Sequence, residues 1–272
     1  MFLNRRSILR DPKKALHIMK KMISYKNGRI FGNHGKNFTA WNTGAIPEIE
    51  EELKNFSKED ISAAAQYWME EIVKKFIDNY LQKYKVGNIC LAGGIFANVK
   101  LNQRIREMDL VDNVFIFPGM TDVGNSIGGA FLKSIEIGQK IQYPIRDVYW
   151  GPEYTDEMVE NSLKAFSDEI NYEKVNEAKI KMAAESLASD KVVGWFQGRM
   201  EYGPRALGTR SILVNATNNE INKTINDRLQ RTEFMPFAPV TLFEFAEKSY
   251  VDWHESHICN NSQNRSILSQ DK

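Results

Sequence analysis

The sequence has few of the residues that build disulfide frameworks and metal clusters. Its 272 residues include two cysteines, Cys90 and Cys259, and four histidines. Two cysteines so far apart in the sequence exclude a disulfide framework and a cysteine-rich zinc cluster. We therefore expect the protein to work in a reducing compartment, the cytoplasm.

Long apolar runs and an excess of one charge are also absent. No apolar run approaches the roughly 20 residues needed to cross a bilayer. The basic start of the chain, residues 1–22, lacks the apolar core of a signal peptide. The formal net charge is +1, which provides no broad basic surface for nucleic acid. The sequence thus predicts neither a membrane nor a nucleic acid as partner.

The composition is that of a folded protein, and the order of the expected helices and strands indicates an α/β fold. Hydrophobic residues make up 42% of the chain and charged residues 26%, which is ordinary for globular domains. Ser57 predicts the start of a long helix. Its expected core face comprises Ile61, Ala65, Trp68, Ile72, Phe76 and Tyr80. The pattern then runs strand, glycine turn, helix, strand, glycine-rich loop and helix. This order is typical of an α/β fold that binds ligands where its strands end.

We expect two units joined by a connector, because the chain is long for a single compact domain. The first unit is expected to span residues 1–140 and the second residues 174–272. Residues 141–173 begin with a proline-containing stretch of no clear period, which indicates a connector. Within the second unit, Lys191 to Gln197 predicts a buried strand, and residues 220–234 predict a helix.

A glycine pair, Gly93-Gly94, follows the first expected strand. Glycines lack a Cβ atom and let backbone amides approach a ligand, and the helix start behind them favours negative charge. The side-chain amide of Asn98, close to this turn, would be free to form hydrogen bonds with a ribose or a base. The alternative is a tight turn that binds nothing.

Asp122 follows the second expected strand, in a loop between Gly119 and Gly124. A carboxylate in this place can bind a metal ion or a ribose hydroxyl. The alternative is that Asp122 only caps the next helix. Two glycine-rich turns after consecutive strands are what actin-like and sugar-kinase-like ATPase domains place around adenosine.

Three arginines lie in the stretch "WFQGRMEYGPRALGTRSIL". Arg199 and Arg205 flank a Gly-Pro turn that can direct both guanidinium groups toward one anion, and Arg210 could bind the same anion. Arginine suits this task because it stays charged and offers two parallel donors to a phosphate. Glu201 could orient one of the guanidinium groups. The alternative is a set of surface ion pairs.

Four motifs resemble the O-carbamoyltransferases of the nodulation-factor and antibiotic-tailoring type. They are "LAGGIFANVKLNQRI", "VFIFPGMTDVGNSIGGA", "VVGWFQGRMEYGPRALGTRSIL" and "INDRLQRTEFMPFAPVTL". The resemblance implies, for residues 1–140, the C-terminal part of an actin-like (ASKHA) domain similar to the enzymes that attach threonylcarbamoyl to tRNA. For residues 174–272 it implies an incomplete small α/β domain that forms carbamoyladenylate.

The reaction implied by the resemblance uses ATP as co-substrate and carbamoyl phosphate as carbamoyl donor. The carbamoyl group then passes to a hydroxyl of a sugar-containing or natural-product acceptor. Arg199 and Arg205 are the implied catalytic residues, which bind carbamoyl phosphate together with Arg210. The implied nucleotide and carbamoyladenylate ligands are Gly93, Gly94, Asn98, Asn226 and Arg231. Asp122 resembles a ligand of Fe²⁺ or a similar divalent metal.

The chain departs from the family pattern at both ends. No His-x-x-x-His metal pair is present, and the match fades after about Tyr250. The resemblance therefore implies the central part of an enzyme, truncated or completed by a second polypeptide. The alternative is an inactive fragment that only binds nucleotide or carbamoyl phosphate. An unrelated actin-like ATPase would explain the glycine turns and leave the arginine-rich stretch unexplained.

Overall fold

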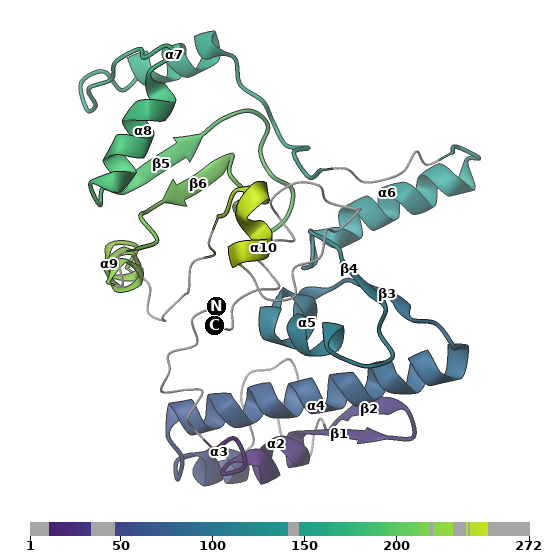
Figure 1. Ribbon diagram of the computed structural model, residues 1–272. Coiled ribbons are helices and arrows are strands. Elements are labelled where there is room, and N and C mark those ends of the chain that lie inside the picture. The colour runs from purple at the N-terminus through teal and green to yellow at the C-terminus, as the bar shows by residue number, and fades with distance from the viewer. Residues whose placement is uncertain are drawn as a thin grey trace. The chain divides into compact units, whose positions relative to one another are not determined.

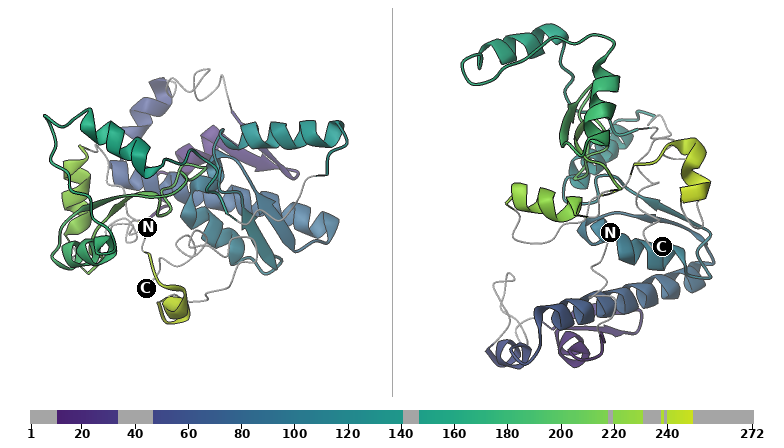
Figure 2. Two further views of the ribbon diagram at one scale, coloured as in Figure 1. Left: turned by 90° about the horizontal axis from the view of Figure 1, so that it is seen from above. Right: turned by 60° about the vertical axis from the view of Figure 1, so that its left-hand side comes forward.

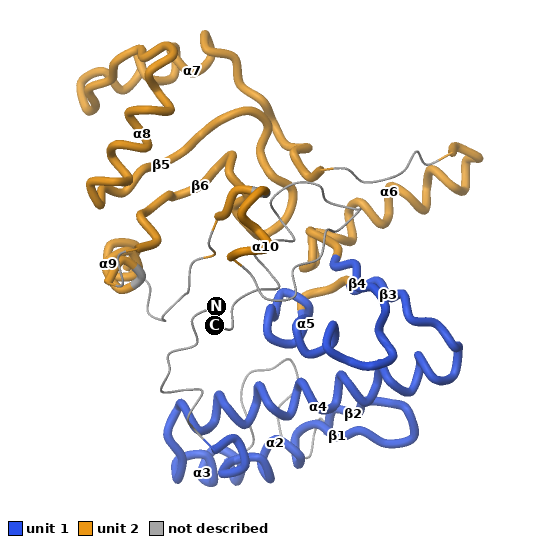
Figure 3. The backbone as a smooth tube through the Cα atoms, in the orientation of Figure 1, with its two compact units in different colours: residues 1–91, 95–116 blue, residues 92–94, 117–272 orange. Residues whose placement is uncertain are grey.

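The computed structural model describes residues 11–33, 47–140, 147–217, 220–230, 238 and 240–249. They form a mixed α/β fold, which confirms the α/β prediction (Figure 1). The strands make three two-stranded sheets: β1–β2 and β5–β6 are antiparallel, and β3–β4 is parallel. Two compact units are formed, unit 1 by residues 1–91 and 95–116 and unit 2 by residues 92–94 and 117–272 (Figure 3).

The elements of unit 1 begin with a helix and a hairpin. In chain order they are α2 (Leu16–Met22), β1 (Ile23–Lys26), β2 (Arg29–Gly32), α3 (Pro47–Leu53), α4 (Lys58–Tyr84), β3 (Asn88–Leu91), α5 (Val99–Arg106) and β4 (Asn113–Ile116). A short 3-10 helix, η2 (Gly94–Ala97), leads into α5. Those of unit 2 are α6 (Gly124–Glu136), α7 (Asp156–Lys164), α8 (Lys179–Ala188), β5 (Val193–Phe196), β6 (Arg210–Leu213), α9 (Ile221–Arg228), η3 (Phe243–Phe245) and α10 (Ala246–Ser249).

The long helix α4 is the central element of unit 1. Its N-terminus is capped as predicted, because the Ser57 hydroxyl oxygen accepts a hydrogen bond from the backbone N–H of Asp60 at 3.1 Å. It ends at Tyr84, because the next residue, Lys85, has a φ of 53° and leaves the helical region. The helix lies between the β1–β2 hairpin with α2 on one side and α5 on the other (Figure 1).

The buried face of α4 differs from the predicted one. The buried apolar side chains are Ala64, Ile72, Val73, Ile77 and Leu81. Of the six predicted positions only Ile72 is fully buried, and Ala65 is exposed. Elements on both sides of the helix share its apolar surface, so the buried stripe is displaced from the one that periodicity alone indicates.

Removing the cap of α4 tests how much this helix depends on its first turn. We expect Ser57→Ala to lower the free energy of unfolding by about 1 kcal/mol, because one backbone N–H loses its acceptor. Urea denaturation followed by far-UV circular dichroism measures the change. Ser62→Ala, an exposed serine further along α4, is the matched control. Equal losses in the two variants would contradict a specific role for the cap.

Helix α5 connects the two parallel strands of unit 1. The register pairs Leu91 with Ile116, so the two chain segments that follow leave the sheet at the same edge. Parallel neighbouring strands need a long crossover connection, which is usually a helix, and α5 is that connection between β3 and β4. Leu101 and Ile105 of α5 are fully buried and anchor it. The strand-helix-strand order predicted from the sequence is confirmed.

Unit 2 is built around the β5–β6 pair, with α8 beside β5 (Figure 2). The strand predicted at residues 191–197 is confirmed as β5, but its predicted burial is wrong, since no residue of β5 is fully buried and Phe196 is 57% exposed. Helix α9 is shorter than predicted and ends at Arg228. Helix α6 has no buried residue and exposes Leu132 and Ile135.

The compact units divide the chain at a different place from the expected domains. Residues 117–140 were expected in the first domain, and the contacts place them in unit 2. The reason is local: the segment after β4 packs against the loop between β5 and β6. A Cβ atom on Gly203 of that loop would lie 2.6 Å from the carbonyl oxygen of Pro118. Among the described residues, no helix is both long and apolar enough to cross a membrane.

Candidate functional site

The arginine-rich stretch forms the connection between two paired strands. β5 and β6 run antiparallel, and their register pairs Phe196 with Arg210. Residues 197–209, which we call the arginine turn, are therefore closed at the base by the sheet. Gly203 has a φ of 115°, and Gly208 has a φ of 100°. Residues with a side chain rarely adopt such values, which explains the glycines that punctuate this stretch.

A buried carboxylate holds the arginine turn together. The side chain of Glu201 is 6% exposed, and its Oε1 atom accepts hydrogen bonds from the backbone N–H groups of Leu207 (2.8 Å), Thr209 (2.7 Å) and Arg210 (3.1 Å). Burial alone would raise the pKa of Glu201, but hydrogen bonds from Thr209 and Leu207 outweigh it and lower the pKa to about 2. The carboxylate is thus ionised at neutral pH.

This arrangement corrects the role expected of Glu201. The sequence suggested that it orients a guanidinium group, and the structure shows that it binds backbone amides. An ionised acceptor that collects several N–H groups fixes the path of a loop. The signal was present in the sequence as the single acid in an otherwise basic, glycine-punctuated stretch.

Arg199 is exposed, and one edge of its guanidinium group is anchored by hydrogen bonds. Its Nε donates to the carbonyl oxygen of Gly151 at 3.1 Å, and its Nη2 donates to that of Trp150 at 3.2 Å. The opposite edge, formed by Nη1 and Nη2, keeps a second pair of parallel donors, which is the geometry that phosphate oxygens accept. Arg205, directly after Pro204, is exposed on the same turn.

Arg210 plays a different part from the one predicted. Its Nη1 donates to the carbonyl oxygens of Gln197 and Thr209, both at 2.8 Å, and its Nη2 donates to that of Gly198 at 3.1 Å. The guanidinium carbon lies 3.6 Å from the centroid of the Phe196 ring. Arg210 therefore ties the base of the turn together, and Arg199 and Arg205 are the better candidates for binding an anion.

Asp122 lies in the loop before α6 and is exposed. The loop touches the arginine turn, because the hydroxyl of Tyr202 donates to the carbonyl oxygen of Val123. Asp122 does not cap α6, which has no side-chain cap. In the part of the chain that the structure describes, no three His, Cys, Asp or Glu side chains come together as metal ligands. One exposed carboxylate is too few ligands for Fe²⁺.

The glycine pair after β3 leaves open space around the backbone. Gly93 has a φ of 101°, and a Cβ atom on Gly93 or Gly94 would meet no atom within 4 Å. The turn therefore has the room that a ligand needs. Asn98 differs from the prediction of a free amide. Its Oδ1 accepts from the backbone N–H of Leu101 at 3.0 Å, and its Nδ2 donates to Oε1 of Gln66 at 2.7 Å.

The remaining predicted nucleotide ligands lie in or after α9. Asn226 is 5% exposed and shares its helix with buried Ile221 and Ile225, so its environment is that of a core residue. Arg231 lies outside the described residues. Binding of nucleotide by these two residues stays a prediction.

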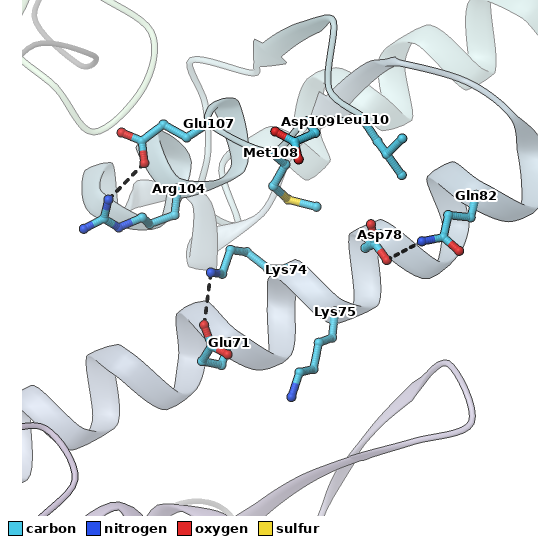
Figure 4. A pocket seen from close by; sticks show the side chains of 10 residues that line it. All are labelled: Glu71, Lys74, Lys75, Asp78, Gln82, Arg104, Glu107, Met108, Asp109 and Leu110. Carbon is cyan, nitrogen blue, oxygen red and sulfur yellow. Dashed lines mark hydrogen bonds and ion pairs between the residues drawn. The ribbon is translucent and has the colours of Figure 1, made fainter.

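A groove in unit 1 is a separate feature. It lies between α4 and the end of α5, where Figure 4 shows two ion pairs among its lining side chains. Nζ of Lys74 lies 3.0 Å from Glu71, and Nη1 of Arg104 lies 2.9 Å from Glu107. The paired charges favour a solvated surface over a binding site.

The comparisons with known proteins cover most of the chain. Residues 13–131 match the family model of the carbamoyltransferase N-terminus, and residues 184–267 match that of the carbamoyltransferase C-terminus.

The chain is also similar to several curated proteins. It is 38% identical over 206 residues to the uncharacterized protein MJ1058 of Methanocaldococcus jannaschii, covering 72% of this chain and 34% of that protein. It is 35% identical over 194 residues to nodulation protein NolO of Bradyrhizobium diazoefficiens, covering 70% and 35%. It is 35% identical over 188 residues to nodulation protein U of Sinorhizobium fredii, covering 68% and 32%.

The chain spans about a third of the length of these three relatives. The two family models follow one another along the chain in the order of their names, and they include the glycine pair, Asp122 and the arginine turn. The resemblance drawn from the four sequence motifs is thereby confirmed, and the chain belongs to the carbamoyltransferase family.

Proposed function

We propose that the chain contributes to an O-carbamoyltransferase that activates carbamoyl phosphate with ATP. Carbamoyladenylate forms at the arginine turn, and its carbamoyl group is transferred to a hydroxyl of a sugar-containing or natural-product acceptor. The observation that carries the proposal is the buried Glu201, which orders a turn on which Arg199 and Arg205 are both exposed. Family membership supplies the carbamoyl chemistry.

The two arginines suit the charges of this reaction. ATP and carbamoyl phosphate are polyanions. Water cleaves carbamoyl phosphate to carbamate and phosphate, a carbamate oxygen bonds to the α-phosphorus of ATP, and pyrophosphate leaves as the bond between the α- and β-phosphates breaks. When the acceptor hydroxyl takes the carbamoyl group, AMP leaves. Negative charge develops on the phosphate oxygens as pyrophosphate leaves. Guanidinium groups fixed in place stabilise that charge without reorganising during the step. Arg199, held by the carbonyl oxygens of Gly151 and Trp150, is fixed in this sense.

The glycine pair and Asp122 belong to the second half of the proposal. Gly93 and Gly94, with open space around them, are proposed to hold carbamoyladenylate during transfer, and Asp122 is proposed to lie near the acceptor. The metal implied by the resemblance does not fit the described residues around Asp122, so no step is assigned to it. A second polypeptide that completes the domains is part of the proposal.

The alternative is a protein that binds carbamoyl phosphate or nucleotide without turnover. It is favoured by one observation: within the described residues, no three His, Cys, Asp or Glu side chains come together as metal ligands. Both functions require an anion at the arginine turn and differ in whether pyrophosphate is released.

Calorimetric titration with carbamoyl phosphate tests the anion site directly. We expect Arg199→Ala to weaken binding about tenfold, since a charge-assisted pair of donors is lost and tenfold corresponds to about 1.4 kcal/mol. Arg104→Ala is the matched control, because Arg104 is an arginine of α5 in unit 1. Equal affinity of the wild type and Arg199→Ala would contradict the assignment.

A further inference from the structure

Tyr202 connects two segments that are far apart in the sequence. Its backbone N–H donates to the carbonyl oxygen of Val148 at 2.7 Å. Its hydroxyl donates to the carbonyl oxygen of Val123 and lies 3.2 Å from Oγ of Ser126. Glu201, the preceding residue, holds the arginine turn. Two neighbouring residues thus fix the turn and the start of α6.

The ring of Tyr202 is held as firmly as its hydroxyl. Its centroid lies 5.2 Å from that of Trp150 and 6.3 Å from that of Phe117. A Cβ atom on Gly119 would lie 2.7 Å from Cε1 of Tyr202, so this glycine makes room for the ring. Aromatic neighbours on two sides restrict the ring to one orientation.

The first turn of α6 depends on this contact because it lacks a cap of its own. Val123 is the N-cap residue, and no side chain accepts from the first N–H groups of the helix. The backbone N–H of Gly124 donates to the Thr121 carbonyl, and that of Asn125 donates to the Asp122 carbonyl, both at 3.0 Å. The hydrogen bond from the Tyr202 hydroxyl is therefore a tertiary contact to Val123, the residue between Asp122 and α6.

From these contacts we propose that Tyr202 is a positioning residue that couples the arginine turn to the Asp122 loop. When an anion binds to Arg199 or Arg205 and steadies the turn, Tyr202 steadies residues 121–126 in turn. The two places assigned to activation and to transfer thereby respond to the same ligand. This inference rests on the proposed function, because it needs carbamoyl phosphate at the turn.

Hydrogen–deuterium exchange with peptide resolution tests the coupling in the full chain. Tyr202→Phe keeps the ring and removes the hydroxyl. Without ligand, we expect the amides of residues 124–126 to exchange about fivefold faster in this variant, the effect of one lost hydrogen bond. With carbamoyl phosphate, wild type should show protection of both the arginine turn and residues 121–126. The variant should show protection of the turn alone.

Tyr172→Phe, which changes an exposed tyrosine of the same unit, is the matched control and should behave as wild type. The coupling is overturned if Tyr202→Phe leaves the exchange of residues 124–126 unchanged, or if the ligand protects both segments in that variant. If carbamoyl phosphate protects neither segment of the wild type, the proposed function fails and the coupling fails with it. The first two results leave the proposed function standing, so the two failures are distinguishable.

Discussion

Arg205→Ala is expected to reduce carbamoyl-phosphate-dependent release of pyrophosphate from ATP by about 10²–10³-fold, the usual effect of removing one fixed donor at a developing charge. Arg205 is exposed and follows Pro204 on the turn that Glu201 orders. The measurement is a coupled pyrophosphate assay of the chain together with any polypeptide that completes its domains.

Arg104→Ala is the control for the loss of a surface arginine. Arg104 pairs with Glu107 in α5, and the distance between Nη1 and Oε2 is 2.9 Å. Its removal is expected to leave the rate unchanged. Full activity of Arg205→Ala would refute the assignment of the anion site. Wild-type protein that binds carbamoyl phosphate and releases no pyrophosphate would favour the alternative function.

Glu201→Gln is expected to lower the free energy of unfolding at neutral pH by about 3 kcal/mol. The pKa of Glu201 is lowered from 4.5 to about 2 in the folded protein. A carboxyl group with a lowered pKa stabilises the folded state above its unfolded pKa, and this contribution is lost as the pH falls through the folded pKa. The free energies of unfolding of wild type and variant should therefore approach one another as the pH falls from about 4.5 to about 2.

Urea denaturation at several pH values measures this difference. Glu160→Gln is the control, because Glu160 forms an exposed pair with Lys164 in α7 at 2.8 Å. Exposed pairs of this kind contribute little to stability, so its loss should be small at every pH. A Glu201→Gln variant whose deficit stays constant down to pH 2 would rule out an ionised carboxylate as the centre of the turn.

Local signals in the sequence predicted local structure well. Ser57 was expected to start a helix, and its hydroxyl accepts the backbone N–H of Asp60, three positions on. Asn98 caps α5 in the same way, although its amide was expected to be free for a ligand. A cap needs one side chain and its own helix start, so the sequence contains all the information required.

Features that depend on distant neighbours were predicted poorly. The buried stripe of α4 is set by elements on both of its sides. The contacts of Tyr202 with Val123 and of Gly203 with Pro118, about 80 residues earlier in the chain, were not foreseen either. No periodicity or spacing records such a contact.

The sequence singled out the stretch that forms the arginine turn, and the structure changes the contacts expected of two of its residues. Binding of an anion by this turn stays a prediction. Arg199 and Arg210 were expected to bind an anion, and Glu201 was expected to orient a guanidinium group. In the structure Glu201 binds backbone N–H groups, and Arg210 binds backbone carbonyl groups. Side-chain chemistry indicates what a residue can bind, whereas its burial and its neighbours decide what it does bind.

The closed base of the arginine turn has a consequence for the thermodynamics of binding. Ordering a loop residue costs about 1–2 kcal/mol in conformational entropy. In the arginine turn that cost is met during folding, by the pairing of Phe196 with Arg210 and by the hydrogen bonds to Glu201. An anion that arrives at the turn finds the path of the backbone already set and reduces only the motion that remains. Its binding should therefore carry a small entropy loss and a modest change in heat capacity.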